Sequence, residues 1–434
     1  MLSNYYYENI LLLFGYNLRK ARKEISRVKK LSRDDFKQWQ ETKRWEIVNY
    51  HFNNNNFYKD KVGSKLPDRW EKLPIIEKKH FQKNLVNLIS TPFIRKSLYK
   101  ANTSGSSGIP LNFAKDKYCH ARSWVTIKNL YKHHNIELGS KEARFYGIPK
   151  DLFGYSYERL KDFIFNRKRF IIFDMSPVVL NNFINRFRNC KIEFIYGYTN
   201  SILLFSEYLI KNKIILKNIC SSLKKVIVTA EQCTEREKKI IEEGTGVGVI
   251  IEYGASECSI IAFECVNGFQ HIIEENLFVE NNDIGEILIT DLSNKAMPFI
   301  RYNIGDRGCI ESIRCSCEFS NNKILTNLTG RTNDTIILPN GRVSPGLTFF
   351  YISREILEKT GGVIKEMVVR QTAINRIEID VVSEKEFTER DRNFIKKQIV
   401  KYLRQDLNIV VNNINSIPRE KSGKIKPFIS EIHK

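Results

Sequence analysis

The sequence has no apolar stretch that approaches the roughly 18 residues of a membrane-spanning helix, so we exclude a transmembrane protein. The short run Ile10–Phe14 is a poor signal peptide, because its basic residues follow it and no small-residue cleavage site is present. The nine cysteines lack regular spacing, so a disulfide framework is not expected. We therefore expect a soluble, cytoplasmic protein.

Acidic residues are also in short supply, with 49 Asp and Glu against 70 Lys and Arg and a net charge of +21. Residues 1–200 carry +20 of this charge, and residues 201–434 carry only +1. A basic lobe attracts phosphates, nucleic acid or an anionic membrane surface. Solvated lysines and a biased base composition explain the same excess without a partner. The recognisable nucleic-acid modules are missing, so a nucleic-acid partner is not expected.

The length of 434 residues predicts two or three folded units, and a content of 42% hydrophobic and 12% aromatic residues excludes a disordered chain. Apolar spacing of three and four predicts helices over Tyr5–Phe14, Leu18–Val28, Asp34–Phe52 and Lys117–Lys132. Farther on, strand patterns alternate with helical ones, which is typical of an α/β core with a partly parallel sheet. The predicted strands are Ile192–Tyr196, Lys225–Thr229, Val247–Tyr253 and Glu286–Thr290, and the predicted helices are Thr199–Ile210 and Thr234–Glu243.

The pattern changes after Gly330. Two paired strands are predicted over Glu366–Gln371 and Arg376–Val382, then a helix over Glu386–Arg404 and a strand over Leu407–Val411. We therefore predict a boundary near Asn333, between a large α/β domain over residues 1–332 and a small α+β domain over residues 333–434.

Three loops carry residues suited to a nucleotide. Thr103-Ser104-Gly105-Ser106-Ser107-Gly108 combines glycine amides, which approach an anion closely, with hydroxyls that donate to phosphate oxygens. Tyr253-Gly254-Ala255-Ser256-Glu257 follows a predicted strand, where a carboxylate can hold Mg²⁺. Arg301-Tyr302-Asn303-Ile304-Gly305-Asp306 offers a carboxylate suited to a ribose diol. Taken singly, such stretches are more often a flexible loop, a capped turn or a hairpin than a nucleotide site.

Two further motifs follow in order, Gly330-Arg331-x-x-Asp334 and Ser422-Gly423-Lys424. The ordered series of five resembles the AMP-forming adenylating enzymes. It is most similar to the phenylacetate–CoA ligase family, particularly the branch found in capsular polysaccharide clusters, and the resemblance spans nearly the whole chain. Further matching stretches are Asn56–Tyr58, Ile195–Tyr198, Ala262–Cys265 and Pro298–Tyr302. This likeness implies a large multi-layer adenylating domain, followed by a small mobile α+β lid.

The resemblance also implies how these residues would bind ATP. Thr103–Gly108 would close over the β- and γ-phosphates, and Ala230-Glu231-Gln232 would line the adenine. Tyr253, followed by Gly254, would pack on the adenine ring, and Asp306 would bind both ribose hydroxyls.

Catalytic and hinge roles follow from the same likeness. Glu257 would hold Mg²⁺, Arg331 would contact ribose or phosphate, and Lys424 would bridge the substrate carboxylate and the α-phosphate. Asn333 and Asp334 would form the hinge.

Two positions depart from the family pattern. Ile109 stands where a lysine usually precedes the proline, and Asn333 replaces the usual first hinge aspartate. A non-catalytic nucleotide-binding protein that kept the fold is therefore an alternative, which the intact Lys424, Asp306 and Glu257 oppose.

Three cysteines and a histidine form a candidate metal site. Cys265, His271, Cys315 and Cys317 form a Cys₃His set that suits tetrahedral Zn²⁺, although buried free cysteines are the ordinary alternative. Members of the phenylacetate–CoA ligase family have a Cys…His…Cys-x-Cys arrangement here, which implies a structural zinc. Cys258 is the alternative fourth ligand.

The expected activity is an ATP-dependent, AMP-forming ligase. A carboxylate would attack the α-phosphorus of ATP, giving an acyl-adenylate and pyrophosphate, and a nucleophile would then displace AMP. By resemblance the acceptor is coenzyme A. The capsule branch allows an amine or hydroxyl on a nucleotide sugar or polysaccharide instead, and peripheral association with a membrane stays open.

The acid pocket is expected around residues 144–149 and 195–200. Tyr146-Gly147 and Tyr196-Gly197-Tyr198 suggest an aromatic lining, although these tyrosines are equally expected to pack the sheet. The identity of the acid is not readable from the sequence.

Overall fold

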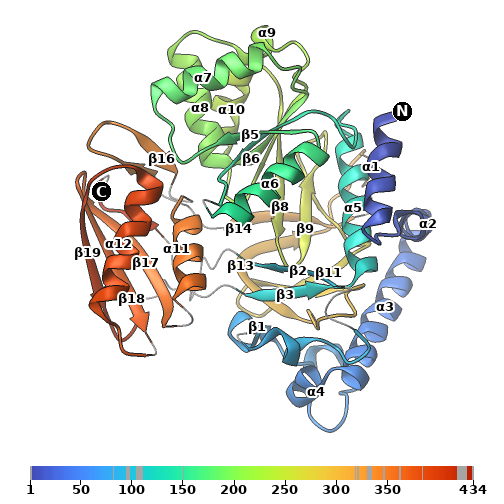
Figure 1. The fold of residues 1–434 in the computed structure, drawn as a ribbon. Helices are drawn as coiled ribbons and strands as arrows, with labels where there is room; N and C mark the ends of the chain where they lie inside the picture. The colour runs from blue at the N-terminus through green and yellow to red at the C-terminus, as the bar shows by residue number, and fades with distance from the viewer. Residues whose placement is uncertain are drawn as a thin grey trace. The chain divides into compact units, whose positions relative to one another are not determined.

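The computed structural model of the chain (Figure 1) describes residues 2–81, 83–93, 98–103, 111–149, 151–317, 319, 322–329, 335–345, 348–360, 363–383, 385–417 and 428–432. These residues form two compact units. Unit 1 comprises Met1–Thr103, Leu111–Gly139 and Ile250–Gly330, and unit 2 comprises Ser104–Pro110, Ser140–Val249 and Arg331–Lys434. The predicted boundary near Asn333 lies outside the described residues and stays a prediction.

Unit 1 starts with helices whose ends follow from local side chains. Ser32 caps the long helix α3, where its Oγ accepts a hydrogen bond from the Asp35 amide at 3.2 Å. Asn55 then leaves the helical conformation, and its side chain accepts from the Tyr58 amide at 3.0 Å to start the next helix. The helices are α1 (Leu2–Leu13), α2 (Leu18–Val28), α3 (Arg33–Asn54), α4 (Asn56–Val62) and α5 (Lys117–Lys132), with 3₁₀ turns η1 (Trp70–Lys72), η2 (Lys78–Phe81) and η3 (Leu85–Leu88).

The sheet of unit 1 is antiparallel in the order β11-β12-β13-β14-β10-β9-β8, with β1 parallel to β13 and a separate hairpin β2–β3. An apolar core of unit 1 contains Phe57, Phe81, Phe113 and Tyr302. Its strands are β1 (Ile76–Glu77), β2 (Tyr99–Asn102), β3 (Asn112–Lys115), β8 (Val249–Ala255), β9 (Ser259–Glu264), β10 (Gln270–Ile272), β11 (Leu277–Asn281), β12 (Glu286–Asp291), β13 (Tyr302–Glu311) and β14 (Ile324–Thr329).

Unit 2 contains a parallel sheet in the order β7-β6-β4-β5, built from strand–helix repeats. The helix α10 starts with a capping box between Thr234 and Glu237, which satisfies amides at its first turn. The elements are β4 (Glu142–Tyr146), α6 (Leu152–Ile164), β5 (Arg167–Ile171), α7 (Pro177–Arg188), β6 (Phe194–Tyr198), α8 (Thr199–Lys211), α9 (Leu216–Ile219), β7 (Lys225–Thr229) and α10 (Glu235–Thr245).

The C-terminal part of unit 2 has a four-stranded sheet, β19-β18-β17-β20, and the hairpin β15–β16. Its apolar core also includes Ile148 and Phe173, and the Phe173 and Tyr402 ring centroids lie 5.3 Å apart. Arg342 Nε lies 3.5 Å from Asp174 Oδ2. The elements are β15 (Thr335–Ile337), β16 (Val343–Pro345), α11 (Thr348–Lys359), β17 (Ile364–Ala373), β18 (Arg376–Ser383), α12 (Glu389–Leu403), β19 (Asn408–Asn413) and β20 (Phe428–Ser430).

The α/β class with a large sheet and a smaller α+β C-terminal part is confirmed. The helices over Leu18–Val28 and Lys117–Lys132 and the strand over Lys225–Thr229 form with the predicted bounds. The strand predicted from Ile192 instead begins at Phe194, because the Ile192 amide donates to the Cys190 carbonyl in a local turn at 2.8 Å. Among the residues that the structure describes, every helix is too short or too polar to cross a bilayer.

Candidate functional site

In unit 1, Tyr253 and Asp306 lie together. Tyr253 is on β8 and Asp306 is on β13, two strands that are not neighbours in the sheet. The Tyr253 hydroxyl donates to Asp306 Oδ2 at 2.9 Å, and both side chains are half-buried. Because the Asp306 carboxylate is partly open to solvent, it can replace its hydrogen bond from Tyr253 with hydrogen bonds from the hydroxyls of a ligand.

Glu257 lies in the turn between β8 and β9 and is 6% exposed. The hydroxyl of Tyr302, itself buried in the unit 1 core, donates to Glu257 Oε1 at 3.0 Å. This bond fixes the direction of the carboxylate. Carboxylate oxygens are ligands that Mg²⁺ prefers, so the chemistry of Glu257 fits that ion.

The loop that was predicted to bind phosphate is described only at its two ends, Thr103 and Leu111. Thr103 donates its amide to the Leu111 carbonyl at 2.9 Å, and the Leu111 amide donates to Thr103 Oγ1 at 2.9 Å. These paired bonds close the base of the loop. The remaining predicted residues of the loop, lid and hinge lie outside the described ones: Ser104, Gly105, Ser106, Ser107, Gly108, Arg331, Asn333, Asp334 and Lys424.

In unit 2, the stretch Ala230-Glu231-Gln232 follows β7 and is tied to the start of α8. Glu231 Oε2 accepts from the Asn200 amide at 2.8 Å, and the Glu231 carbonyl accepts from Thr199 Oγ1 at 3.3 Å. Ala230 has φ 68°, a left-handed conformation that costs a non-glycine residue roughly 1 kcal/mol or more. Strain of this kind persists where surrounding contacts fix it, and here Glu231 supplies them.

The three predicted tyrosines form one cluster in unit 2. Tyr146 stacks on Tyr196 with ring centroids 5.8 Å apart, and the Tyr146 and Tyr198 centroids lie 4.2 Å apart. Tyr198 is buried, whereas Tyr146 and Tyr196 keep part of their surface exposed. A Cβ on Gly197 would lie 2.5 Å from Phe145 Cβ, so that glycine permits the close approach of β6 to β4.

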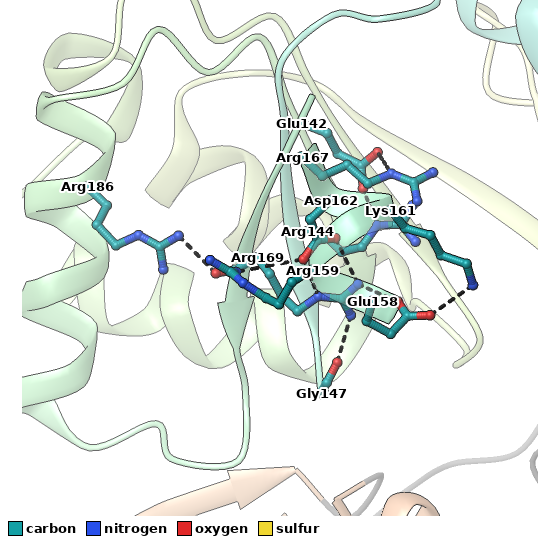
Figure 2. Close-up of polar contacts among 10 residues, drawn as sticks. All are labelled: Glu142, Arg144, Gly147, Glu158, Arg159, Lys161, Asp162, Arg167, Arg169 and Arg186. Atoms are coloured by element: carbon teal, nitrogen blue, oxygen red, sulfur yellow. Dashed lines mark hydrogen bonds and ion pairs between the residues drawn. The ribbon is translucent and has the colours of Figure 1, made fainter. Parts of the chain in front are cut away.

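Figure 2 shows a charge network on β4, β5 and α6 that the sequence did not predict. Register places Glu142 opposite Arg167 and Arg144 opposite Arg169 on β4 and β5. Glu142 pairs with Arg144 and, at 3.2 Å, with Arg167. Arg169 donates to Asp162 at 2.8 Å and to the Gly147 carbonyl at 2.8 Å.

The network positions the residues around the predicted acid pocket. The Arg169 guanidinium fixes the backbone at Gly147, and the Arg144 guanidinium lies 4.9 Å from the Tyr196 ring centroid. Burial alone would raise the pKa of Glu142, but the charges of Arg144 and Arg167 outweigh it and lower that pKa. The only sequence signal was the alternation Glu142-x-Arg144 and Arg167-x-Arg169, which has meaning only once the strands pair.

The four predicted metal ligands come together in unit 1. Cys265 follows β9, His271 is on β10, and Cys315 and Cys317 lie between β13 and β14. Their ligand atoms all lie within 4.8 Å of one another. Cys265 Sγ lies 3.9 Å from Cys315 Sγ, and Cys317 Sγ lies 3.3 Å from His271 Nε2.

These separations fit zinc. A tetrahedral site with Zn–S bonds of about 2.3 Å has sulfur atoms about 3.8 Å apart. Burial acts to raise the pKa of the Cys315 thiol, but hydrogen bonds from Asn267, the Cys317 backbone and His271 outweigh it and lower the pKa to about 6. Burial and the neighbouring Cys315 raise the pKa of Cys317 to about 12. Cys258 is not part of this cluster of described residues, and burial raises the pKa of its thiol.

Comparisons with known proteins agree with this architecture. Residues 349–431 match the family model of the CapK C-terminal domain. Phenylacetate–coenzyme A ligase of Thermus thermophilus is 31% identical over 139 residues, which cover 29% of this chain and 31% of that protein. The match therefore spans about a third of the relative's length.

Solved structures of 2-hydroxyisobutyryl-CoA ligase have the same fold. The open form with adenylate and CoA has a TM-score of 0.56 at 15% identity and covers 91% of this chain and 92% of its own. The form in the thioesterification state has a TM-score of 0.59 at 15% identity, with 93% and 91% covered. The fold and the resemblance to the phenylacetate–CoA ligase family, including its capsule-associated branch, are confirmed.

Proposed function

We propose that this chain, a relative of the phenylacetate–CoA ligases with the fold of AMP-forming ligases, activates a carboxylic acid with ATP. The acid attacks the α-phosphorus to give an acyl-adenylate and pyrophosphate, and coenzyme A then displaces AMP to give a thioester. A carboxylate is already ionised at neutral pH, so this attack needs no general base. Catalysis rests on positioning and on charge stabilisation around phosphorus.

The proposal rests on one observation, the 2.9 Å hydrogen bond that the Tyr253 hydroxyl donates to the Asp306 carboxylate. These two residues come from separate motifs of the adenylating series, and the fold joins them. We assign Asp306 to both ribose hydroxyls and Tyr253 to the adenine ring. The stretch Ala230-Glu231-Gln232 and the residue Gly254 complete the proposed adenine contacts.

Other roles follow the motif matches. Thr103–Gly108 would cover the β- and γ-phosphates, Arg331 would contact ribose or phosphate, and Asn333 and Asp334 would form the hinge of a lid over residues 333–434. Mg²⁺ held by Glu257 would neutralise phosphate charge. Tyr146, Gly147 and the segment Tyr196–Tyr198 would line the acid pocket.

Zn²⁺ is proposed as a structural ion held by Cys265, His271, Cys315 and Cys317. It would join the β9–β10 hairpin to the segment between β13 and β14. Four protein ligands close the coordination shell, so no position is left for a substrate.

Asp306→Ala is expected to weaken ATP binding by roughly 10- to 150-fold, since a hydrogen bond to a charged group is worth about 1.5–3 kcal/mol. Titration calorimetry with ATP measures this change. Asp283→Ala is the matched control, because Asp283 is an exposed carboxylate in the turn between β11 and β12.

Tyr253→Phe separates the contribution of Tyr253 from that of Asp306, since it keeps the Asp306 carboxylate and the aromatic ring and removes only the hydroxyl. We expect it to bind ATP more tightly than Asp306→Ala does. Unchanged ATP affinity in Asp306→Ala, with a melting temperature like that of the parent, would remove the ribose assignment.

The match to the CapK C-terminal domain over residues 349–431 supports an alternative acyl acceptor in place of coenzyme A. In that case the acyl group passes to an amine or hydroxyl of a nucleotide sugar or polysaccharide. Screening carboxylic acids for pyrophosphate release, with and without coenzyme A, distinguishes the two. An acid that releases pyrophosphate but yields no thioester favours the sugar acceptor.

A further inference from the structure

Helix α6 has its polar side toward the protein. Asp162 and Glu158 face β5, where both carboxylates accept hydrogen bonds from Arg169, at 2.8 Å and 2.6 Å (Figure 2). The Asp162 side chain is only 4% exposed. Most surface helices direct an apolar stripe inward and charges outward, so α6 is reversed.

The outward side of α6 is apolar. Leu152, Phe153, Tyr157, Leu160 and Phe163 are 85%, 91%, 60%, 55% and 81% exposed. At 3.6 residues per turn they fall on one half of the helix, opposite Glu158 and Asp162. Five large side chains gathered on one face of a helix mark an interaction site rather than ordinary surface scatter.

Positive charges outnumber negative ones around this face, with Arg159, Lys161 and Arg169 against Glu158 and Asp162. The Arg159 side chain is 52% exposed and lies 3.8 Å from Asp162 Oδ2, and the Lys161 side chain is 37% exposed and lies 2.9 Å from Glu158 Oε1. Glu158 and Asp162 also bind Arg169, and Asp151 Oδ1 accepts from the Gly154 amide at 2.7 Å. The exposed apolar face therefore has two cations at its edge, and each carboxylate of α6 is shared with Arg169.

We propose that α6 docks on the surface of an anionic lipid bilayer. Leu152, Phe153, Leu160 and Phe163 would enter the boundary between headgroups and acyl chains, and Arg159 and Lys161 would contact lipid phosphates. A helix of Phe, Leu and Tyr with flanking Arg and Lys has the composition of interfacial helices.

A second copy of the chain fits this face less well. Two α6 helices packed together would bring Arg159 and Lys161 of both copies into one interface, where the nearby Glu158 and Asp162 carboxylates are already shared with Arg169. The +20 charge of residues 1–200 also draws the chain toward an anionic surface over a Debye length. This inference does not depend on the proposed ligase activity.

Co-sedimentation of the full chain with vesicles tests the proposal. We expect binding to vesicles of phosphatidylcholine with phosphatidylglycerol and at least tenfold weaker binding to phosphatidylcholine alone. Leu160→Ser with Phe163→Ser should lower the partition coefficient about tenfold or more, since each side chain leaves the acyl boundary. Arg159→Gln should lower it about fivefold on anionic vesicles only.

Ile284→Ser is the matched control, because Ile284 is 62% exposed in the β11–β12 turn and belongs to unit 1, whereas α6 belongs to unit 2. It should bind vesicles like the parent. Equal binding by the Leu160→Ser, Phe163→Ser variant would overturn the proposal. A parent dimer that this variant dissociates in sedimentation velocity, without vesicle binding by the parent, would assign the face to a second copy instead.

Discussion

Replacing Lys424 by alanine is expected to slow adenylate formation by roughly 100- to 1000-fold, the loss typical of one removed charge-stabilising donor at about 2.7–4 kcal/mol. Lys424 lies in the polar segment Arg419-Glu420-Lys421-Ser422-Gly423-Lys424. The preceding residue, Gly423, is a glycine, a residue type with a wide choice of backbone conformations, and a lysine ammonium is a compact charge on a four-carbon stem. If it bridges the carboxylate and the α-phosphate, its contribution grows as negative charge develops around phosphorus.

The two half-reactions separate this role from a structural one. Lys424→Ala should still convert preformed acyl-adenylate in the second half-reaction, because the bond to phosphorus is already made. Lys421→Ala, three residues earlier, is the matched control and should adenylate normally. Equal loss of both half-reactions would indicate a folding or docking role, and full adenylation would show that the catalytic lysine lies elsewhere.

Removing two zinc ligands is expected to have the largest effect on stability. Cys315→Ser with Cys317→Ser leaves Cys265 and His271 alone, so the purified variant should lose its zinc, against about one zinc per chain in the parent. If the metal stabilises the unit by about 3 kcal/mol, the contribution of one cross-link between chain segments, its loss corresponds to a fall of roughly 6–12 °C in melting temperature for a unit of this size. Elemental analysis and thermal unfolding measure the two effects.

Cys309→Ser provides the control, since Cys309 is an exposed cysteine on β13 outside the cluster. It should keep both the metal and the melting temperature. Substoichiometric zinc in the parent after growth with ample metal would contradict the assignment. So would an unchanged melting temperature in the double variant.

Local signals predicted much of the fold. Helices α2 and α5 form over the predicted residues because apolar spacing and the caps Asn17 and Asp116 agree there. The zinc candidates were also readable, because thiols and imidazoles are few enough that their order along the chain is informative.

Pairs distant in sequence were harder to predict. Tyr253 and Asp306 were each identified by motif, but their hydrogen bond joins residues 53 positions apart and depends on the sheet. The Arg169 network was missed because Arg169 is on β5 while its carboxylate partners are on α6, and only strand register brings Arg144 beside it. Periodicity also cannot say which side of an amphipathic helix faces inward, so the reversal of α6 was invisible.

Ile148 and Phe173 share an apolar core with the C-terminal strands, and this affects whether the chain can be expressed as two separate fragments. Ile148 and Phe173 are buried at 3% and 5% exposure among side chains that include Ile379 and Tyr402. A gene cut near residue 333 would leave these apolar patches bare on both fragments. Expressed separately, the two pieces should be prone to aggregate, whereas co-expression should let each cover the other.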